Sequence, residues 1–324
     1  MSGRHTKIIS VGAAVQDVFL SNSPEFKAVS ERPDESFIQL ELGAKADVNN
    51  ITFSTGGGAS NAAVTFARQG LHSIFMGTIG HDPAGMAVLN SLDQENVDTS
   101  LVSYSYSYKT GYSVLLLAPN GERTILTYRG ASTHYHKKDF NLEALDADWL
   151  YVSTLSGNLE LLYSLFSQAK ARGIKIMFNP GKRELAQREK LVALLEDVDV
   201  LCVNRDEIQQ IVEGASLEEL VRHGHHYCPV VIVSDGPNGI VASDGKTIVR
   251  AGMYHDVKVV DRTGAGDAFG SGFLSQWAQG RSLVESIIFA SANSTSVVNH
   301  IGAKTGILPK GVKLHHMPIH EKPY

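Results

Sequence analysis

Short apolar runs with no polar alternation, separated by segments of helical period, constrain this chain more than any other feature. The runs predict strands at residues 8–11, 74–79, 149–153, 174–179, 200–204 and 230–234. Helical patterns lie between them at residues 61–68, 84–95, 159–172, 186–195 and 217–223. A strand without a polar side is covered on both faces, and an intervening helix lets the next strand run parallel. The pattern therefore predicts an α/β fold: a doubly wound, mostly parallel sheet with helices on both faces.

Two segments depart from this rhythm. Residues 24–55 hold alternating, more polar runs, and residues 111–129 have the pattern of a hairpin around Asn120-Gly121, a strong tight-turn signal. We expect them to form a small β-sheet beside the main one, as a lid over a site, an oligomer contact, or both. The lid would comprise about residues 16–55 and 108–130. Because no linker or repeat interrupts the chain, we expect a single domain over residues 1–324.

Composition excludes several classes of protein. With 324 residues, 43% of them hydrophobic, the chain can bury a large core. The net charge of −5 and the isoelectric point near 6.2 argue against a nucleic-acid-binding protein. No apolar run approaches the roughly 18 residues that span a membrane. The two cysteines, Cys202 and Cys228, lie in apolar surroundings, which favours reduced thiols and a cytoplasmic protein.

Residues 261–272, with the sequence DRTGAGDAFGSG, connect an apolar strand pattern to a helical one. The small residues Gly264, Ala265 and Gly266 let backbone N–H groups approach an anion, and a helix dipole adds positive potential there. Asp267 has two explanations. It can favour the helix start as a first-turn acid, or it can be the base that takes a proton from an alcohol beside a bound phosphate. The stretch predicts a phosphate site with a carboxylate inside it.

A second glycine-rich element, TGGGASNAA at residues 55–63, opens another helix. Three successive glycines indicate close approach of the backbone to a ligand or to another segment. Asn61 offers a donor and an acceptor to a polyol. Asp17 follows the first strand, where it can accept hydroxyl protons from a sugar or lie exposed in a loop.

Asn204 and Glu207 come at the end of the apolar run at 200–204 and are three residues apart. If a helix begins here, the two side chains share one face, which suits Mg²⁺-bound water and phosphate. The structural alternative is a helix N-cap followed by first-turn acids.

Two common nucleotide motifs are absent from the sequence, and one metal motif is incomplete. No Walker glycine-lysine string occurs, and Phe269 stands where a Rossmann motif needs its third glycine. Two histidine groups lack any recognised zinc spacing, so we expect surface histidines there. Their members are His223, His225, His226, His315, His316 and His320.

Together these elements resemble the ribokinase-like carbohydrate kinase family, also called PfkB, over nearly the whole chain and in the family's order. The first family signature is similar to residues 56–70, followed by the pattern GTIGHDPAG at residues 77–85. Residues 204–207 are similar to the family's Asn-x-x-Glu motif, and residues 234–239 to its nucleotide-side loop. The most specific match is the second signature, at residues 261–272.

The resemblance implies an ATP-dependent kinase that phosphorylates a hydroxymethyl group, with Asp267 as general base. The amides implied for the anion hole belong to Gly264, Ala265 and Gly266. The residues implied to hold the acceptor are Asp17, Gly57, Gly58 and Asn61. The residues implied to organise Mg²⁺ and phosphate are Asn204 and Glu207. The positions implied to lie along ATP are Ser234, Gly236, Gly239 and Asn293.

The resemblance also implies a monovalent-cation site, a K⁺ site in many members, at Asp261 and Thr263. Arg262 lies between them, where the family more often has a small or β-branched residue. Whether a monovalent cation binds here is therefore an open question at this point. The lid segments are often a dimer clasp in this family, so a homodimer through the lid is expected.

The acceptor stays open. Gly58 replaces the lysine of ribokinases proper, and residues 152–157 lack the acidic residue that ribokinases place there. A sugar, a nucleoside, fructose or a 2-keto-3-deoxy-sugar acid all fit the resemblance. A nucleoside kinase of the adenosine type is the alternative enzyme, and a catalytically silent sugar or nucleotide sensor is the alternative from another class.

Overall fold

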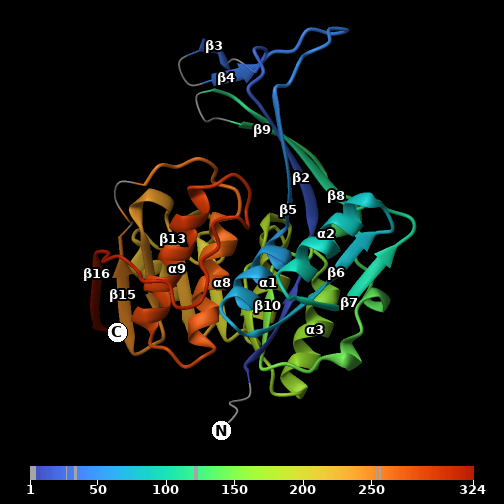
Figure 1. Ribbon diagram of the computed structural model, residues 1–324. Helices are drawn as coiled ribbons and strands as arrows, with labels where there is room; N and C mark the ends of the chain where they lie inside the picture. Colours follow the sequence, from blue (N-terminus) through green and yellow to red (C-terminus); the bar gives the residue numbers. More distant parts are fainter. Residues whose placement is uncertain (1–4, 27, 33–34, 120–122, 253, 255–256) are drawn as a thin grey trace.

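A large, mostly parallel sheet forms the body of the protein (Figure 1). The computed structural model describes residues 5–26, 28–32, 35–119, 123–252, 254 and 257–324. In spatial order the ten strands of the main sheet are β16 (Ile319–Pro323), β15 (Thr247–Ala251), β14 (Ile240–Ser243), β13 (Val230–Ser234), β12 (Val200–Asn204), β11 (Lys175–Phe178), β10 (Trp149–Val152), β1 (Lys7–Val11), β6 (His72–Gly80) and β7 (Asp98–Ser105).

The strands from β13 to β7 run parallel, and β14 to β16 add an antiparallel edge. All six strands predicted from apolar runs are confirmed, as β1, β6, β10, β11, β12 and β13. Their side chains are almost all buried, and every residue of β10 is. Apolar residues with no polar side form strands here because both faces of the sheet are covered.

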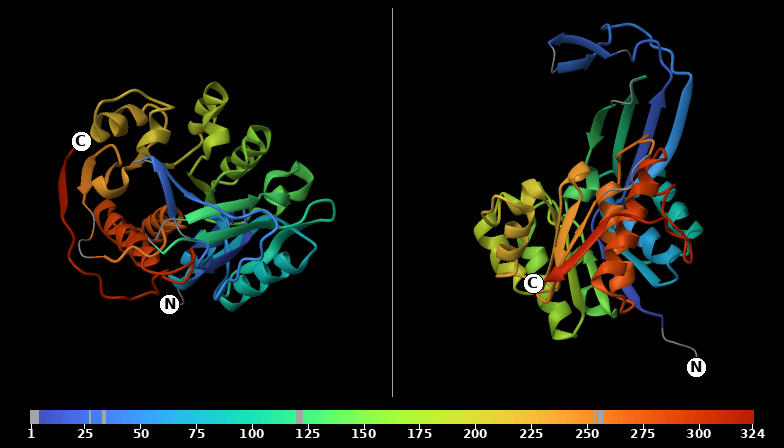
Figure 2. Two further views of the ribbon diagram at one scale, coloured as in Figure 1. Left: turned by 90° about the horizontal axis from the view of Figure 1, so that it is seen from above. Right: turned by 90° about the vertical axis from the view of Figure 1, so that its left-hand side faces the viewer.

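Helices cover the two faces of this sheet (Figure 2). On one face lie α3 (Leu159–Ala171), α5 (Arg188–Leu195) and α7 (Leu217–Gly224). On the other lie α1 (Gly58–Arg68), α2 (Pro83–Gln94), α8 (Ala265–Trp277) and α9 (Leu283–Val298). The predicted doubly wound fold is confirmed. Two single-turn helices, α4 (Lys182–Leu185) and α6 (Arg205–Ile208), follow β11 and β12 at their carboxyl ends.

A four-stranded sheet projects from the body, and we call it the small sheet (Figure 1). Its order is β5 (Asn50–Gly56), β2 (Val15–Ser21), β8 (Gly111–Leu117) and β9 (Arg123–Tyr128). A separate hairpin of β3 (Ala28–Arg32) and β4 (Glu35–Ile38) lies beyond it. The predicted second sheet is confirmed, and so is the antiparallel pairing of β8 with β9. The predicted turn at Asn120-Gly121 lies outside the described residues.

The two faces of the small sheet differ in chemistry. Residues in register across the four strands share a face. One such row is Ser54, Asp17, Ser113 and Thr127. The neighbouring row on the opposite face is Phe53, Val18, Val114 and Leu126. A Cβ on Gly302 of the body would meet the Ser54 hydroxyl at 2.7 Å, so the face that carries Ser54 and Asp17 is the one toward the body. The next row on that face contains the apolar Phe19 and Leu115.

No helix among the described residues combines the length and the apolar character needed to cross a membrane.

Candidate active site

The start of α8 is a turn that only glycine fits. Gly264 precedes the helix with φ of 78°, in the left-handed region, and a Cβ on it would lie 2.4 Å from the Cβ of Ala303. The amide of Ala265 closes the turn through a long bond of 3.3 Å to the carbonyl of Arg262. A Cβ on Gly266 would meet no atom within 4 Å. The helix start therefore has positive potential and open space beside it, which suits an anion.

Asp267 lies in the first turn of α8, next to the predicted acceptor residue Asn61 of α1. The Asn61 side-chain amide donates a hydrogen bond of 2.9 Å to Asp267 Oδ2. Burial raises the pKa of Asp267, and the bond from Asn61 opposes this. Protein surrounds the carboxylate, while the residue as a whole is only partly buried and its neighbour Gly266 is exposed. A carboxylate with a raised pKa beside open space is suited to taking a proton.

Asn61 carries an unused acceptor. It is 3% exposed, and among the described residues its Oδ1 has no hydrogen-bond partner. A buried polar atom without a partner is rare in proteins, and one at a candidate site indicates a place for a ligand donor. A hydroxyl of an acceptor would satisfy it.

The glycines at the start of α1 lie where a larger side chain would come too close to neighbouring atoms. Gly57 has φ of 98°, and a Cβ on it would lie 2.4 Å from the Ala13 carbonyl oxygen. A Cβ on Gly58 would lie 3.1 Å from both Asp267 Oδ1 and the Ser153 Cβ. A longer side chain at position 58 would therefore enter the space in front of Asp267.

Asp17 closes the same region from the small sheet. It is 5% exposed, and its Oδ2 lies 2.3 Å from where a Cβ on Gly56 would be, so a side chain at position 56 would displace this carboxylate. Burial raises the pKa of Asp17, while a hydrogen bond with Ser113 and the charge of Lys304 oppose this. The structure thus brings Asp17, the glycines of residues 56–58, Asn61 and Asp267 together, although the sequence separates them by 250 residues.

The nucleotide-side residues form a second group. Asn204 and Ser234 pair in register at the carboxyl ends of β12 and β13. The Asn204 side chain accepts from the Glu207 amide at 2.9 Å, and Glu207 accepts from the Asn204 amide at 2.9 Å. The N-cap explanation is thereby confirmed, and burial raises the pKa of Glu207. Gly236 and Gly239 both have positive φ in the turn that follows Ser234. A role for these residues at ATP stays a prediction.

Asn293 is placed differently from the expectation. It is fully buried, its Nδ2 donates to the Ala268 carbonyl at 2.8 Å, and its Oδ1 accepts from the Leu308 amide at 2.9 Å. Both ends of its amide are used inside the protein. Its observed role is to fasten the segment after α9 to α8, and the predicted contact with ATP gains no support.

The monovalent-cation site predicted at Asp261 and Thr263 gains no support from the contacts of the Asp261 carboxylate. Asp261 Oδ1 accepts from the amide of Thr263 at 3.0 Å and from its hydroxyl at 2.7 Å, and Oδ2 accepts from the Gly302 amide at 3.1 Å. Arg123 of the small sheet lies with its Nη1 3.8 Å from Asp261 Oδ1. The carboxylate is already surrounded by donors and by a guanidinium charge that repels a metal cation.

The first histidine group, at residues 223–226, makes local hydrogen bonds. The Nδ1 atoms of His223 and His225 hydrogen-bond to the carbonyls of Glu213 and Cys228. In the part of the chain that the structure describes, no group of three or more His, Cys, Asp or Glu residues has the geometry to hold a metal ion.

Three residues beside the site were not predicted. Ser153 borders Gly58, Arg123 reaches Asp261 from the small sheet, and Lys304 is buried near Asp17. Arginine and lysine are usually exposed, so no local signal marks the last two. Only the glycines at positions 302 and 306 hint that the segment around Lys304 lies close to other parts of the chain.

Comparisons with known proteins point to one family. The model of the pfkB family carbohydrate kinases matches residues 29–310. The ribokinase of Haemophilus influenzae is 27% identical over 270 residues, covering 80% of this chain and 85% of that protein. The nucleoside kinase of Methanocaldococcus jannaschii is 26% identical over 310 residues, covering 95% of each chain. The ATP-dependent ribose-1-phosphate kinase of Halopiger xanaduensis is 26% identical, covering 82% and 87%.

Solved structures show the same fold. The crystal structure of the Methanocaldococcus jannaschii nucleoside kinase has a TM-score of 0.74 at 22% identity, covering 95% of this chain and 96% of the other. The Arabidopsis thaliana ribokinase complexed with ribose and ATP has a TM-score of 0.73 at 22% identity, covering 94% and 96%. Since the family model covers most of the chain, and motifs, fold and relatives all agree, this protein belongs to the pfkB family of carbohydrate kinases.

Proposed function

We propose that this kinase transfers the γ-phosphoryl group of ATP to a hydroxymethyl group of a sugar or sugar-like acceptor, with Asp267 as the general base. The observation that carries this proposal is the position of Asp267. Its carboxylate, surrounded by protein, lies at the start of α8, beside the open space at Gly266 and bonded to Asn61. The proposed base Asp267, the proposed anion site at Gly266 and the proposed acceptor residue Asn61 are therefore neighbours.

The chemistry follows from this arrangement. Asp267 takes the proton of the acceptor hydroxyl, whose oxygen forms a bond to the γ-phosphorus. The bond from that phosphorus to the bridging oxygen of ADP breaks, and ADP leaves with the electron pair. Backbone N–H groups of Gly264, Ala265 and Gly266, with the dipole of α8, stabilise the charge on the transferred group.

Acceptor and nucleotide approach from different sides. Asp17, Asn61 and the backbone at Gly57 and Gly58 line the acceptor side. Ser234, Gly236 and Gly239 line the nucleotide side, and Asn204 with Glu207 would bind the water and phosphate around Mg²⁺. When bound with ATP, Mg²⁺ neutralises charge on the phosphates.

A nucleoside kinase is the second candidate. The nucleoside kinase of Methanocaldococcus jannaschii matches 95% of both chains, whereas the ribokinase of Haemophilus influenzae matches 80% of this one. A panel of D-ribose, D-fructose, adenosine and a 2-keto-3-deoxy-sugar acid, assayed for phosphorylated product with ATP and Mg²⁺, separates the candidates. Tight binding of one compound with no product from any would favour a sensor and contradict the kinase.

Substitution of Asp267 by asparagine tests the mechanism. A positioned base contributes about 10²–10⁴-fold, so Asp267→Asn should lower kcat by that order on the best acceptor. Nucleotide affinity, measured by calorimetry, should change little. The control is Asp93→Asn, an exposed aspartate on α2. Full turnover of Asp267→Asn would rule out Asp267 as the base.

The stability of the same variant shows whether its fold is intact. Because the folded-state pKa of Asp267 is raised, ionising this carboxylate destabilises the fold as pH rises from the unfolded-state pKa through the folded one. Asp267→Asn should therefore have a higher Tm than the wild type at pH 7. The difference should vanish below the ordinary aspartate pKa. Lower Tm at pH 7 would mean that lost activity reflects lost structure.

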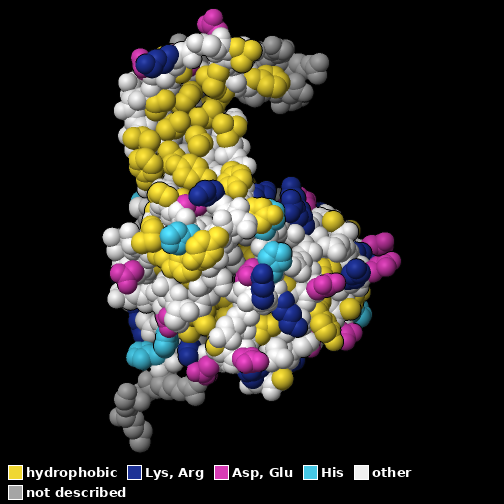
Figure 3. Space-filling model, turned by 90° about the vertical axis from the view of Figure 1, so that its right-hand side faces the viewer, with side chains coloured by type: hydrophobic (Ala, Val, Ile, Leu, Met, Phe, Trp, Pro, Cys, Tyr) yellow, Lys and Arg dark blue, Asp and Glu magenta, His cyan; other side chains and the backbone are white. Residues whose placement is uncertain are grey.

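We also propose that the small sheet is a lid over the acceptor and that its outer face joins two copies of this chain. Figure 3 shows hydrophobic side chains gathered along the small sheet. On β5 and β9, Phe53 is 62% exposed, Leu126 58% and Tyr128 50%. An apolar row of this kind on a sheet face is usually covered by another protein surface.

A further inference from the structure

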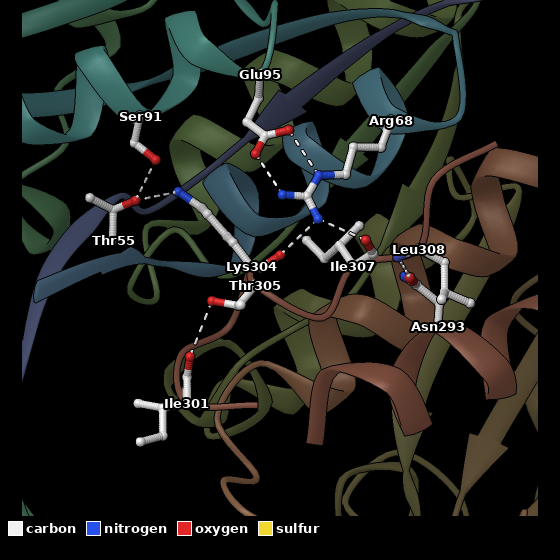
Figure 4. A network of polar contacts seen from close by, with 10 residues as sticks. All are labelled: Thr55, Arg68, Ser91, Glu95, Asn293, Ile301, Lys304, Thr305, Ile307 and Leu308. Carbon is white, nitrogen blue, oxygen red and sulfur yellow. Dashed lines mark hydrogen bonds and ion pairs between the residues drawn. The ribbon is translucent and has the colours of Figure 1, made fainter. Parts of the chain in front are cut away.

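The hydroxyl of Ser153, directly after β10, is almost without a hydrogen-bond partner. Other buried polar side chains use theirs: Lys304 Nζ donates to Thr55 Oγ1 at 2.8 Å, and that hydroxyl donates onward to Ser91 Oγ at 2.9 Å (Figure 4). Ser153 is 3% exposed, and among the described residues its hydroxyl has one contact, of 3.5 Å to the Val11 carbonyl. Hydrogen bonds between oxygens are usually about 2.5–3.0 Å long. The Ser153 hydroxyl can therefore still donate and accept.

The glycines around Ser153 show what its hydroxyl faces. A Cβ on Gly12 would lie 2.2 Å from Ser153 Oγ, and a Cβ on Gly58 would lie 3.2 Å from it. The same Cβ position at Gly58 lies 3.1 Å from Asp267 Oδ1. Asn61 is bonded to the other oxygen of that carboxylate, Oδ2. The Ser153 hydroxyl and the Asp267 oxygen that Asn61 leaves free therefore border the same small space at Gly58.

The loop that follows Ser153 has a backbone that needs support. Ser156 and Gly157 both have positive φ, of 61° and 83°. This region is unfavourable for serine, and a residue is held in it only where its surroundings stabilise it. Arg183 Nη1 donates to Ser156 Oγ at 2.8 Å, and the Gln187 side chain donates to the Gly157 carbonyl at 2.9 Å. Residues of α4 and the turn after it therefore hold this loop in place.

Glu184 of α4 makes most of the bonds to the loop. It is fully buried, at 0% exposure. Its carboxylate accepts hydrogen bonds from one hydroxyl and three backbone amides: Thr154 Oγ1 at 2.8 Å, and the amides of Leu155 at 2.9 Å, Gly157 at 2.8 Å and Gly181 at 3.1 Å. A carboxylate removed from water needs such donors, and in return it fixes the groups that supply them.

Ser153 is thus held from both sides. Its own amide donates to the Val11 carbonyl of β1 at 3.0 Å. The next residue, Thr154, is bonded to Glu184. A hydroxyl with spare capacity, fixed in place beside the proposed base, is suited to selecting a ligand that offers it a hydrogen-bonding group.

We propose that Ser153 is a specificity-determining residue of the acceptor site, whose hydroxyl forms a hydrogen bond with an acceptor hydroxyl other than the one phosphorylated. Glu184 is its positioning residue, because it touches no substrate and holds the loop that keeps Ser153 beside Asp267. The inference rests on the proposed function, in which Asp267 marks the reacting hydroxymethyl group. The acceptor is then a polyol with a second hydroxyl close to that group. A contact made equally before and during transfer changes acceptor affinity and leaves kcat nearly unchanged.

The first test pairs Ser153→Ala with changes in the acceptor. The panel acceptor with the highest kcat/KM is compared with analogues that each lack one hydroxyl but keep the hydroxymethyl group. A hydrogen bond between uncharged groups contributes about two- to tenfold, so Ser153→Ala should raise the KM of the parent acceptor by that factor, with kcat within about twofold. In the wild type, one analogue should have a KM higher than the parent by a similar factor. In Ser153→Ala that analogue and the parent should have equal KM.

Ser91→Ala is the matched control for this variant. Ser91 of α2 also carries a hydroxyl near the small sheet, but it is bonded to Thr55 (Figure 4). Ser91→Ala should leave the KM ratio between each analogue and the parent unchanged. A purely structural role of Ser153 would likewise leave these ratios unchanged, so the ratios separate recognition of a hydroxyl from a general loss of structure.

The second test is Glu184→Gln. The new amide group is a donor where one carboxylate oxygen accepts, so the loop should loosen and the acceptor KM should rise by up to the factor seen for Ser153→Ala. Combined with Ser153→Ala, it should raise KM no further. If Glu184→Gln does not fold, Thr154→Val, which removes one of the four bonds, takes its place. Asp199→Asn is the control, because Asp199 accepts from the Ile176 amide at 2.8 Å, before β12 at the opposite edge of the main sheet.

The outcomes are distinct. If Ser153→Ala leaves KM unchanged, or raises it by the same factor for the parent and every analogue, the role of Ser153 is overturned, and a loss of kcat in Asp267→Asn still supports the proposed function. If Glu184→Gln and Thr154→Val leave KM unchanged, or raise it equally with and without Ser153, the positioning role of Glu184 is overturned. If Asp267→Asn keeps full turnover, or no panel compound yields product, the proposed function fails, and this inference fails with it.

Discussion

The main sheet and the small sheet differ in how much of their strands is buried. Strands such as β1, β10 and β13 are buried on both sides by helices. The strand β9 of the small sheet is exposed along nearly its whole length, and β5 is buried only where it joins the body. The base proposed for the reaction belongs to the body, on α8, while Asp17 belongs to the small sheet. Under the proposed function we expect a division in which the body alone carries the transfer step, while acceptor binding is shared between Asp17 of the small sheet and Asn61 of the body.

The largest expected effect lies in the body, at Gly264. In Gly264→Ala the new Cβ would overlap Ala303 in a left-handed conformation, so the turn that presents the amides must shift. Losing a preorganised donor lowers kcat on the order of 10²–10³-fold. Gly280→Ala is the matched control, because Gly280 also has φ of 78° but open space around its Cβ. If both variants lower kcat to the same extent, the overlap with Ala303 does not cause the loss. The proposal that the turn at Gly264 presents amides to the phosphate would then be contradicted.

An intermediate effect is expected where the two sheets meet, at the ion pair of Arg123 with Asp261. A partly exposed pair contributes about 0.2–1 kcal/mol, so Arg123→Gln should raise the acceptor KM by up to about fivefold with little change in kcat. Hydrogen exchange should quicken along β9. Arg250→Gln, at an exposed arginine of the body strand β15, is the comparison. Faster hydrogen exchange in the helices of the body, and not in β9, would contradict a role for this ion pair in holding the small sheet.

The smallest change in kcat is expected for the outer face of the small sheet, the face that carries Phe53 and Leu126. The association state of the protein should change clearly. Phe53→Ser should shift the protein toward the monomer in analytical ultracentrifugation, with kcat changing less than about twofold. Tyr163→Ser on α3 is matched in exposure, at 63% against 62% for Phe53, and should leave the association state unchanged. A wild type that is monomeric at all concentrations would remove the proposed interface.

The strands that could be predicted from the sequence are those whose own residues form a fully apolar run. β10 to β13 were predicted because a fully apolar run must be covered on both sides, whatever covers it. β7, with the sequence DTSLVSYS, was missed because an edge strand keeps polar residues. The short antiparallel strands β14 to β16 were missed because pairing at the sheet edge, rather than hydrophobic period, determines them.

The candidate site divides in the same way. The positions of Gly57, Gly264 and Asp267 at two helix starts could be predicted, because glycine-rich helix starts are visible in the sequence, while their roles stay predictions. The buried position of Lys304 could not be predicted, because its partner Thr55 is 249 positions away. Asn293 was assigned to ATP by analogy, and the structure instead uses both ends of its amide to join α8 with the segment after α9.

The hydrogen bond between Asn61 and Asp267 has a consequence for how the protein is made. The bond joins residues 206 positions apart, and the Lys304–Thr55 bond spans 249. Contacts of such long sequence separation form late in folding, because a long loop must close before they are made. A ribosome-bound chain that has not yet released residue 267 holds Asn61 and the first glycine element without Asp267. The proposed site is therefore completed only after both glycine-rich helix starts have been synthesised and have folded against each other.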